Sequence, residues 1–344
     1  MDDKQVADLF ERRAFPGASS PARLVSTHIS WVILSPDYAF KIKKPVRFSF
    51  LDFSTTSLRA RYCKEEYRLN RRLAPDTYLG VLPIGWKDGD LHIGVKNRPA
   101  FDYAVWMRKE DNSRELDVLL RAGDVKAEDM KKLAYKLAAF HRQHTMRHRN
   151  IDMGVLIRDF SAIFSHNQAL SHHLGTQVLA ELNEMERTLP GIITSLKGRM
   201  NERSRAGFRV DGHGDLHSRN IFLTDDPILF DCIEFDARLR HLDVLDELAF
   251  LAMDLEFFKR PDLAEALLRF YTEKHACLIT PEDEALFLYY KAYRANVRLK
   301  VTVLDTSHKT EKQEMMKQYW SLLSSYWLQL TKMVDSHLNE QRSD

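Results

Sequence analysis

Apolar and polar residues alternate over short stretches of the first hundred residues, which is the pattern of half-buried strands. A short helix is expected first, at 4–13. The stretches with strand character are 22–26, 30–34, 38–44, a hairpin over 80–94 with an Asp88-Gly89 turn, and 101–109. Polar joints separate the first three, which predicts an antiparallel meander. Residues 56–74 change to helical spacing and stop before Pro75, so this part predicts a β-rich lobe with one long helix.

The rest of the chain has mainly helical periodicity. Apolar side chains recur at helical spacing over 127–143. Further helices are expected at about 156–187, 243–257, 262–276, 282–304 and 311–337. Only 207–236 interrupts them with short strand-like runs. We therefore predict an α+β chain with two lobes: an N-terminal lobe, 1–108, built on an antiparallel sheet, and a larger, mainly helical C-terminal lobe, 109–344.

Composition and charge exclude several classes of protein. The chain of 344 residues is 44% hydrophobic, enough for a full core, and 51 Lys and Arg against 49 Asp and Glu give a net charge of only +2. A nucleic-acid partner is therefore not indicated. No apolar run approaches the ~18 residues of a membrane helix, and the N-terminus is not a signal peptide. Three well-separated cysteines, Cys63, Cys232 and Cys277, lack disulfide-framework or zinc spacing, so we expect a cytoplasmic protein.

The stretch DGHGDLHSRNIFLTDDPILFDCIEFD, residues 211–236, carries the densest polar chemistry. Its two apolar runs predict a hairpin that turns at Asp225-Asp226-Pro227 and brings Asn220 and Asp231 together at its open end, with Asp215 on the same side. Asp215 and Asn220 are five residues apart, as in the phosphoryl-transfer loop H-R-D-x-x-x-x-N. That chemistry needs a carboxylate to accept a hydroxyl proton, and an amide oxygen with a second carboxylate to hold Mg²⁺.

The residues HGDLHSRNIFL followed by ILFDCIEFD resemble the motifs of the aminoglycoside phosphotransferase-like family. The resemblance implies a bilobal protein-kinase-like fold that uses ATP and Mg²⁺ to phosphorylate a hydroxyl of a small-molecule acceptor. Carried over by position, the resemblance implies that Asp215 is the catalytic base, that Asn220 and Asp231 bind Mg²⁺, and that His213 supports the loop. Glu234 matches the family's trailing acid, which supports the metal site. The role of His217 stays open: it would contact either the γ-phosphate or the substrate.

Other interpretations of the same residues remain. His213, Asp215 and His217 alternate, so on an extended segment they would point one way and form the metal triad of a hydrolase. That arrangement leaves Asn220 and Asp231 unexplained. Within the kinase-like fold, the alternatives are a protein kinase, a nucleotidyl transferase and a nucleotide-binding pseudoenzyme.

The N-terminal half contains candidates for a phosphate-binding lysine and its glutamate partner. In YAFKIKKPV, residues 38–46, Lys41 and Lys43 share one face of a strand. The resemblance favours Lys41, with Lys43 second. In the following helix Glu66 lies on the apolar face with Leu69, so it is preferred to Glu65 as the partner.

Other nucleotide contacts are expected without a glycine-rich loop. The first turn of the meander is Ser26-Thr27-His28-Ile29-Ser30, whose hydroxyls and backbone N–H groups would contact phosphate. A G-x-x-x-x-G-K-[ST] motif is absent, which excludes a P-loop kinase. Backbone groups near Trp106 and Met107 are expected to bind adenine, although Trp106 fits core packing equally well. Asp243 or Asp246 would hold the catalytic loop, or else favour a helix N-terminus.

A basic stripe is the candidate acceptor site. In YYKAYRANVRLK, residues 289–300, Lys291, Arg294 and Arg298 lie within about one-sixth of a helix circumference. They are either the solvated edge of a packed helix or a site for an anionic or sugar-like acceptor. Because an aminoglycoside would require acidic clusters instead, we expect a sugar, an amino sugar or a similar metabolite.

Overall fold

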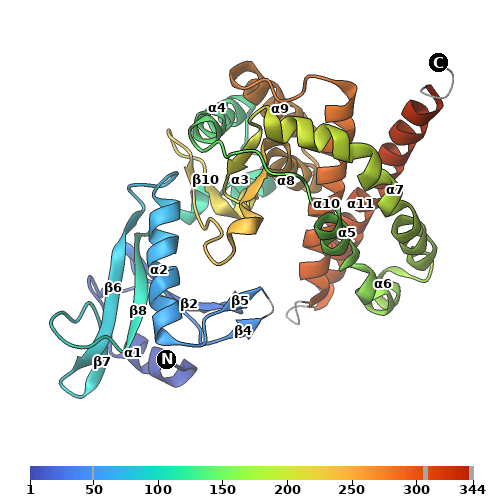
Figure 1. Ribbon diagram of the computed structural model, residues 1–344. Coiled ribbons are helices and arrows are strands. Elements are labelled where there is room, and N and C mark those ends of the chain that lie inside the picture. Colours follow the sequence, from blue (N-terminus) through green and yellow to red (C-terminus); the bar gives the residue numbers. More distant parts are fainter. Residues whose placement is uncertain (49, 305–308, 341–344) are drawn as a thin grey trace. The chain divides into compact units, whose positions relative to one another are not determined.

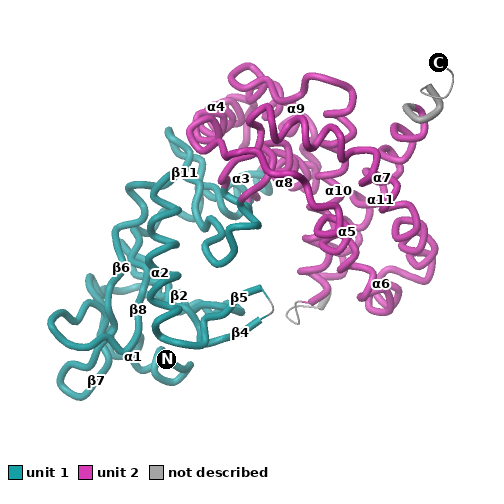
Figure 2. The backbone as a smooth tube through the Cα atoms, in the orientation of Figure 1, with its two compact units in different colours: residues 1–122, 213–215, 219–240 teal, residues 123–212, 216–218, 241–344 magenta. Residues whose placement is uncertain are grey.

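The chain folds into two compact units in a computed structural model that describes residues 1–48, 50–304 and 309–340. Unit 1 comprises residues 1–122, 213–215 and 219–240, and unit 2 comprises 123–212, 216–218 and 241–344 (Figure 2). Most of the polar stretch 211–236 therefore belongs to unit 1, although it follows the long helix that ends at Arg205 in unit 2.

Unit 1 is built on a six-stranded sheet in the order β1-β2-β3-β8-β6-β7, with antiparallel pairing between neighbours (Figure 1). The strands are β1 (Arg23–Ser26), β2 (Ser30–Leu34), β3 (Tyr38–Lys43), β6 (Tyr78–Lys87), β7 (Asp90–Ile93) and β8 (Asp102–Arg108). The predicted meander, hairpin and final strand are thus confirmed. The hairpin turn has φ of +52° at Asp88 and +92° at Gly89, as an Asp-Gly turn of this kind requires.

Two helices cover opposite faces of this sheet. Helix α1 (Asp3–Glu11) contributes Val6 and Leu9 to a core that contains Phe40 and Ile42 of β3. Helix α2 (Thr56–Asn70) contributes Cys63 to a second cluster that contains Ala39 of β3. Because side chains alternate across a strand, Lys41 and Lys43 share the face of Ala39 and lie toward α2.

Smaller elements complete unit 1. They are β4 (Arg47–Phe48), β5 (Leu51–Asp52), α3 (Leu116–Ala122), β10 (Ile221–Phe222) and β11 (Ile228–Leu229), with 3₁₀ turns at Asn112–Arg114 and Ala237–Leu239. A third 3₁₀ turn, Ser218–Asn220, has its first residue in unit 2 and the other two in unit 1. Strands β10 and β11 pair as Ile221 with Leu229 and Phe222 with Ile228. The N–H of Phe230 also donates to the carbonyl of Asn220 at 3.0 Å, so the predicted hairpin is confirmed.

Unit 2 is mainly helical. Its helices are α4 (Ala127–Gln143), α5 (Met153–Ser161), α6 (Asn167–Leu174), α7 (Val178–Arg205), α8 (Val244–Phe257), α9 (Pro261–Lys274), α10 (Pro281–Leu304) and α11 (Lys309–Glu340), with a 3₁₀ turn at Phe164–His166. A short antiparallel pair, β9 (Arg209–Asp211) with β12 (His241–Asp243), interrupts them. Within the residues that the structure describes, no helix is both long and apolar enough to cross a membrane.

The helix predictions for unit 2 are confirmed except for one. The single helix expected at 156–187 is wrong, because α5, α6 and α7 occupy that part of the chain. Helix α6 ends at Leu174 and is capped by Gly175, whose positive φ of +97° favours glycine. Helix α7 then continues to Arg205 with Pro190 inside it, well beyond the predicted end.

Candidate active site

The centre of the candidate site is a buried glutamate between two lysines. Glu66 of α2 has a fully buried side chain; its Oε1 lies 2.9 Å from Lys41 Nζ and its Oε2 2.6 Å from Lys43 Nζ. Burial alone would raise the pKa of Glu66, but the two ammonium groups outweigh burial and lower that pKa. Glu65, the residue that was not preferred, pairs with Arg68 on the outside of the helix.

The two lysines differ in their second partner and in exposure. Lys43 is 1% exposed and makes a second ion pair with Glu234. Lys41 is 14% exposed and lies 2.5 Å from Asp231, whose side chain is 42% exposed. Burial by itself would lower the pKa of Lys41, but the nearby carboxylates raise it well above its ordinary value. Lys41 is therefore the lysine that reaches the open side of the cluster, whereas Lys43 is enclosed.

The segment after β11 is anchored at each residue from Asp231 to Glu234. The bonds join Asp231 N–H to Tyr78 Oη at 3.2 Å, Cys232 N–H to Asn70 Oδ1 at 2.9 Å and Ile233 N–H to the His213 carbonyl at 3.2 Å, and Glu234 pairs with Lys43. Asp231 has a φ of +60°, which residues other than glycine seldom adopt. These contacts fix that conformation, and with it the direction of the Asp231 carboxylate.

His213 links the polar loop to the hairpin. Its Nε2 lies 2.8 Å from the Phe230 carbonyl, and its Nδ1 lies 3.3 Å from the N–H of Asp215. A carbonyl can only accept, so Nε2 carries the proton and Nδ1 is the acceptor. Gly214 follows with a φ of +87°, and a Cβ there would lie 2.8 Å from the Leu239 carbonyl oxygen. The loop therefore needs a glycine between His213 and Asp215.

Asp215 and Asn220 come together as their spacing predicted. Nδ2 of Asn220 donates to the backbone carbonyl of Asp215 at 2.9 Å and approaches its carboxylate Oδ2 at 3.4 Å. These contacts orient the amide, with its nitrogen toward Asp215. The oxygen donors of Asn220 and Asp231 fit a hard cation such as Mg²⁺, which takes its remaining ligands from phosphates and water.

The metal triad of a hydrolase is not formed. Among the residues that the structure describes, no group of three or more His, Cys, Asp and Glu residues is placed to hold a metal ion. The His213 ring is used by Phe230 and Asp215, as described above. His217 belongs to unit 2, where its ring packs edge-on against Phe250 at 5.6 Å. The alternation of 213, 215 and 217 fails to align these residues because this stretch is a turn and not an extended strand.

In unit 2, an acid that the sequence interpretation missed holds the middle of the loop. Asp254 of α8 is buried and accepts the N–H of Ser218 at 2.7 Å. Asp243 instead caps α8 through Leu245 N–H at 2.8 Å, and Asp246 pairs with Arg294 at 2.6 Å. A charged residue inside the apolar run AFLAMDLEF is the signal that could have identified Asp254.

The other predicted nucleotide contacts lie in ordinary structural positions. Ser26 Oγ accepts from Lys44 at 2.8 Å, and Thr27 Oγ1 closes its turn by accepting from Ser30 N–H at 3.0 Å. Trp106 packs on Tyr38, with ring centroids 5.4 Å apart, on the α1 side of the sheet. Met107 is buried on the α2 side. Phosphate and adenine binding at these positions stay predictions.

The basic stripe on α10 is already paired within unit 2. Lys291 lies 2.5 Å from Glu256, Arg294 Nε lies 2.6 Å from Asp246, and Arg298 donates to Tyr319 Oη at 3.2 Å. Lys291 and Arg294 are also buried, so of the two alternatives the solvated edge is wrong for both. An anionic acceptor would have to compete with these partners.

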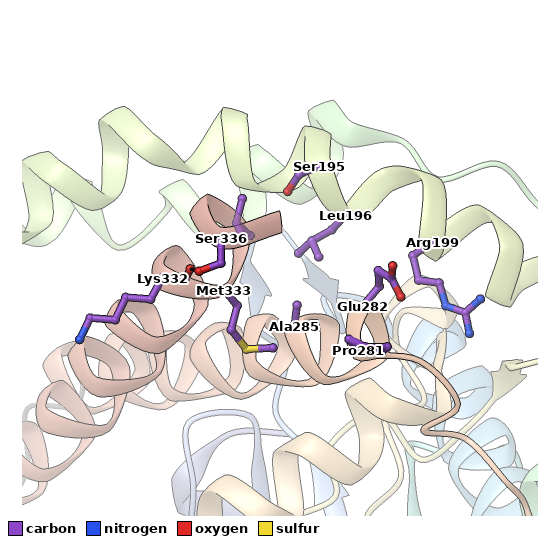
Figure 3. A pocket seen from close by; sticks show the side chains of 10 residues that line it. Ser195, Leu196, Arg199, Pro281, Glu282, Ala285, Lys332, Met333 and Ser336 are labelled. Carbon is purple, nitrogen blue, oxygen red and sulfur yellow. Dashed lines mark hydrogen bonds between the residues drawn. The ribbon is translucent and has the colours of Figure 1, made fainter. Parts of the chain in front are cut away.

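A separate cavity of about 440 Å³ lies in unit 2 among α7, the start of α10 and the end of α11 (Figure 3). It is lined by Ser195, Leu196, Arg199, Pro281, Glu282, Ala285, Lys332, Met333, Val334 and Ser336. None of the predicted site residues, all of which the structure describes, is among them. The cavity therefore does not mark the chemistry assembled in unit 1.

Comparison with known proteins gives relatives by sequence and by structure. No protein-family model matches the chain. Uncharacterized proteins of Mycobacterium bovis and Mycobacterium tuberculosis are 36% identical over 278 residues, which is 80% of this chain and 53% of theirs. The chain thus spans about half the length of the curated relatives that it matches.

Solved structures share the fold at low sequence identity. A choline kinase from Cryptosporidium parvum matches with a TM-score of 0.52 and 11% identity over 99% of both chains. The GDP and kanamycin complex of APH(2″)-IIIa matches with a TM-score of 0.52 and 14% identity over 95% of this chain and 99% of that one. Spectinomycin phosphotransferase APH(9)-Ia in complex with ADP and spectinomycin matches with a TM-score of 0.50 and 7% identity over 89% of this chain and 92% of that one. The chain therefore has the protein-kinase-like fold that aminoglycoside phosphotransferases and choline kinases share.

Proposed function

We propose that this protein is an ATP- and Mg²⁺-dependent phosphotransferase that transfers the γ-phosphoryl group to a hydroxyl of a small molecule. One observation carries the proposal: Lys41, Glu66 and Asp231 meet in one ion-paired cluster although they come from three separate segments of unit 1. Phosphoryl transfer requires a lysine held by a helix glutamate beside a metal-binding aspartate. Two solved structures with this fold hold GDP or ADP together with a small molecule, which agrees with that assignment.

The positions of the loop residues support the remaining roles. Asp215 accepts the proton of the acceptor hydroxyl while the hydroxyl oxygen attacks the γ-phosphorus, and the nucleoside diphosphate leaves. With nucleotide bound, Lys41 would exchange its contact with Asp231 for one with the phosphates, and the Asp231 carboxylate would then be available to the metal. Asn220 and Asp231 would hold the Mg²⁺, which would neutralise phosphate charge. His213 positions Asp215 through the N–H contact at 3.3 Å.

The acceptor is proposed to be a sugar, an amino sugar or a similar metabolite. The contacts of α10 place Lys291, Arg294 and Arg298 beside partners within unit 2, so acceptor recognition by this stripe would need a strongly anionic group. All three cysteines are buried thiols, which fits the reducing conditions of the cytoplasm.

Replacement of the base tests the proposal. ADP release would be followed with ATP and Mg²⁺ across sugars, amino sugars, amino alcohols and nucleosides. Asp215→Asn should lower kcat by about 10²- to 10⁴-fold, because general-base catalysis contributes that much. Asp226→Asn, in the exposed turn of the same hairpin, is the matched control and should keep wild-type turnover. Undiminished turnover by Asp215→Asn would exclude Asp215 as the base.

Labelled ATP separates the alternatives on the same fold. With γ-labelled ATP, label on the small-molecule acceptor supports the proposal, and label on a polypeptide indicates a protein kinase. Transfer of label from α-labelled ATP indicates a nucleotidyl transferase. Stabilisation of the protein by ATP and Mg²⁺ without turnover on any acceptor would indicate a nucleotide-binding pseudoenzyme.

A further inference from the structure

Lys43 and Glu234 are the two members of the charged cluster that the proposed reaction does not use. Their side chains are only 1% and 5% exposed, and they contact each other. A buried ion pair costs desolvation of both charges, and an apolar pair of similar volume often gives equal or greater stability. Stability alone therefore does not account for two charges at this place.

The position of Lys43 connects two segments that the reaction does use. Its ammonium group lies 2.6 Å from Oε2 of Glu66, while Oε1 of the same carboxylate faces Lys41. Its other carboxylate partner, Glu234, lies three residues after Asp231. The ring of Phe53 covers the ammonium at 4.7 Å. Lys43 thus joins the helix glutamate to the proposed metal segment from an enclosed position.

Removal of Lys43 would disturb both segments. Oε2 of Glu66 would lose its partner, so the carboxylate would no longer be held with Oε1 toward Lys41. Glu234 would lose its cation at an enclosed position and, in its ionised form, would compete with Asp231 for Lys41. In addition, the backbone of Asp231 would lose one of the contacts that hold its φ of +60°.

We infer that Lys43 is a positioning residue, which through its ion pairs with Glu66 and Glu234 sets Lys41 for the nucleotide and Asp231 for the metal. This role rests on the proposed function. It differs from the role of Lys41, because Lys43 acts through other residues and does not touch the phosphates. Partners that orient metal ligands in this way typically change metal affinity or activity by about 10- to 100-fold.

The test compares four variants with one reference and two controls. Lys43→Met and Glu234→Gln remove one charge each, a double variant removes both, and Lys43→Arg keeps the charge. Lys41→Met, which removes the proposed phosphate-binding lysine, is the reference. Lys64→Met and Glu65→Gln, on the outer side of α2, are the matched controls. For each variant that thermal melting shows to be folded at the assay temperature, kcat, the KM for ATP and the Mg²⁺ concentration at half-maximal rate would be measured.

Lys43→Met and Glu234→Gln should each raise the KM for ATP and the half-maximal Mg²⁺ concentration by about 10- to 100-fold. The double variant should lose no more than the single variants, because both act through one ion pair. Lys43→Arg should restore most of the Mg²⁺ response, and the controls should match the wild type. If Lys43→Met does not fold, Glu234→Gln and Lys43→Arg carry the same measurement.

Two results would overturn the inference. Wild-type KM and Mg²⁺ values in Lys43→Met or Glu234→Gln would mean that the pair is only structural. Loss of kcat in Lys43→Met as large as in Lys41→Met, with Glu234→Gln unaffected, would make Lys43 the phosphate-binding lysine itself. Failure of the proposed function is recognised separately, because the wild type would then release no ADP or Asp215→Asn would remain fully active. In that case, ATP and Mg²⁺ titrations followed by thermal shift still compare Lys43→Met with the wild type.

Discussion

Replacement of Glu66 by glutamine tests the reasoning about the charged cluster most directly. The substitution keeps the shape of the side chain but removes the one negative charge that both lysines share at 2.9 and 2.6 Å. Removal of one partner from a buried ion pair costs about 3–5 kcal/mol, since an uncompensated charge stays buried. The glutamine oxygen still accepts a hydrogen bond, which offsets about 1 kcal/mol. We therefore expect Glu66→Gln to lose roughly 2–4 kcal/mol of unfolding free energy at pH 7.

The difference in unfolding free energy between the wild type and Glu66→Gln should depend on pH. The pKa of Glu66 is lowered in the folded protein, so its ionised form contributes stability above the ordinary value of 4.5. That contribution decreases as the pH falls below this value toward the folded pKa. Urea unfolding at pH 7 and pH 3.5 should therefore show a smaller difference between wild type and Glu66→Gln at the acidic pH.

The control is Glu65→Gln, at the residue before Glu66, which removes a partly exposed partner of Arg68. Exposed pairs contribute about 0–1 kcal/mol, so this variant should unfold close to the wild type at both pH values. Equal destabilisation by Glu66→Gln at pH 7 and pH 3.5 would refute the assignment of a stabilising carboxylate between the lysines.

Further predictions concern the loop glycine and a buried acid of unit 2. Gly214→Ala should destabilise by about 1–3 kcal/mol, because φ is +87° and the new Cβ would meet the Leu239 carbonyl at 2.8 Å. At Gly123, φ is +78° and the space around an added Cβ is open, so Gly123→Ala carries only the backbone cost. In urea unfolding, Gly214→Ala should therefore lose more unfolding free energy than Gly123→Ala. Asp283→Asn removes a carboxylate whose burial would raise its pKa but whose bonds from Arg199, Ile279 N–H and Arg203 lower it to about 2 from 3.8. That lowering corresponds to about 2 kcal/mol of stability, present above pH 3.8 and lost as pH falls toward 2, so the two proteins should converge in acid unfolding.

Local patterns in the sequence were sufficient for most of the fold and for several residues that the structure brings together at the candidate site. Strand alternation placed Lys41 and Lys43 on one face of β3, and helical spacing placed Glu66 on the inner face of α2. The five-residue spacing of Asp215 and Asn220, followed by a hairpin, brought these two side chains into contact. Such features depend on residues close to one another in the chain, and the periodicity of one element determines them.

Other features were decided by contacts between distant segments. Lys43 and Glu234 are 191 residues apart, and nothing in either local pattern indicates that they pair. Likewise Asp254, rather than Asp243 or Asp246, reaches the loop at Ser218, because its place on α8 faces that backbone N–H.

The exposure of charged side chains also needed the tertiary structure. Spacing on α10 predicted a basic edge, yet Lys291 and Arg294 are buried against acids of α8. The sequence by itself determined which residue types lie on each face of each element. Packing decided which charges meet and which stay open to solvent, since burial and ion pairing depend on what the rest of the chain places opposite each face.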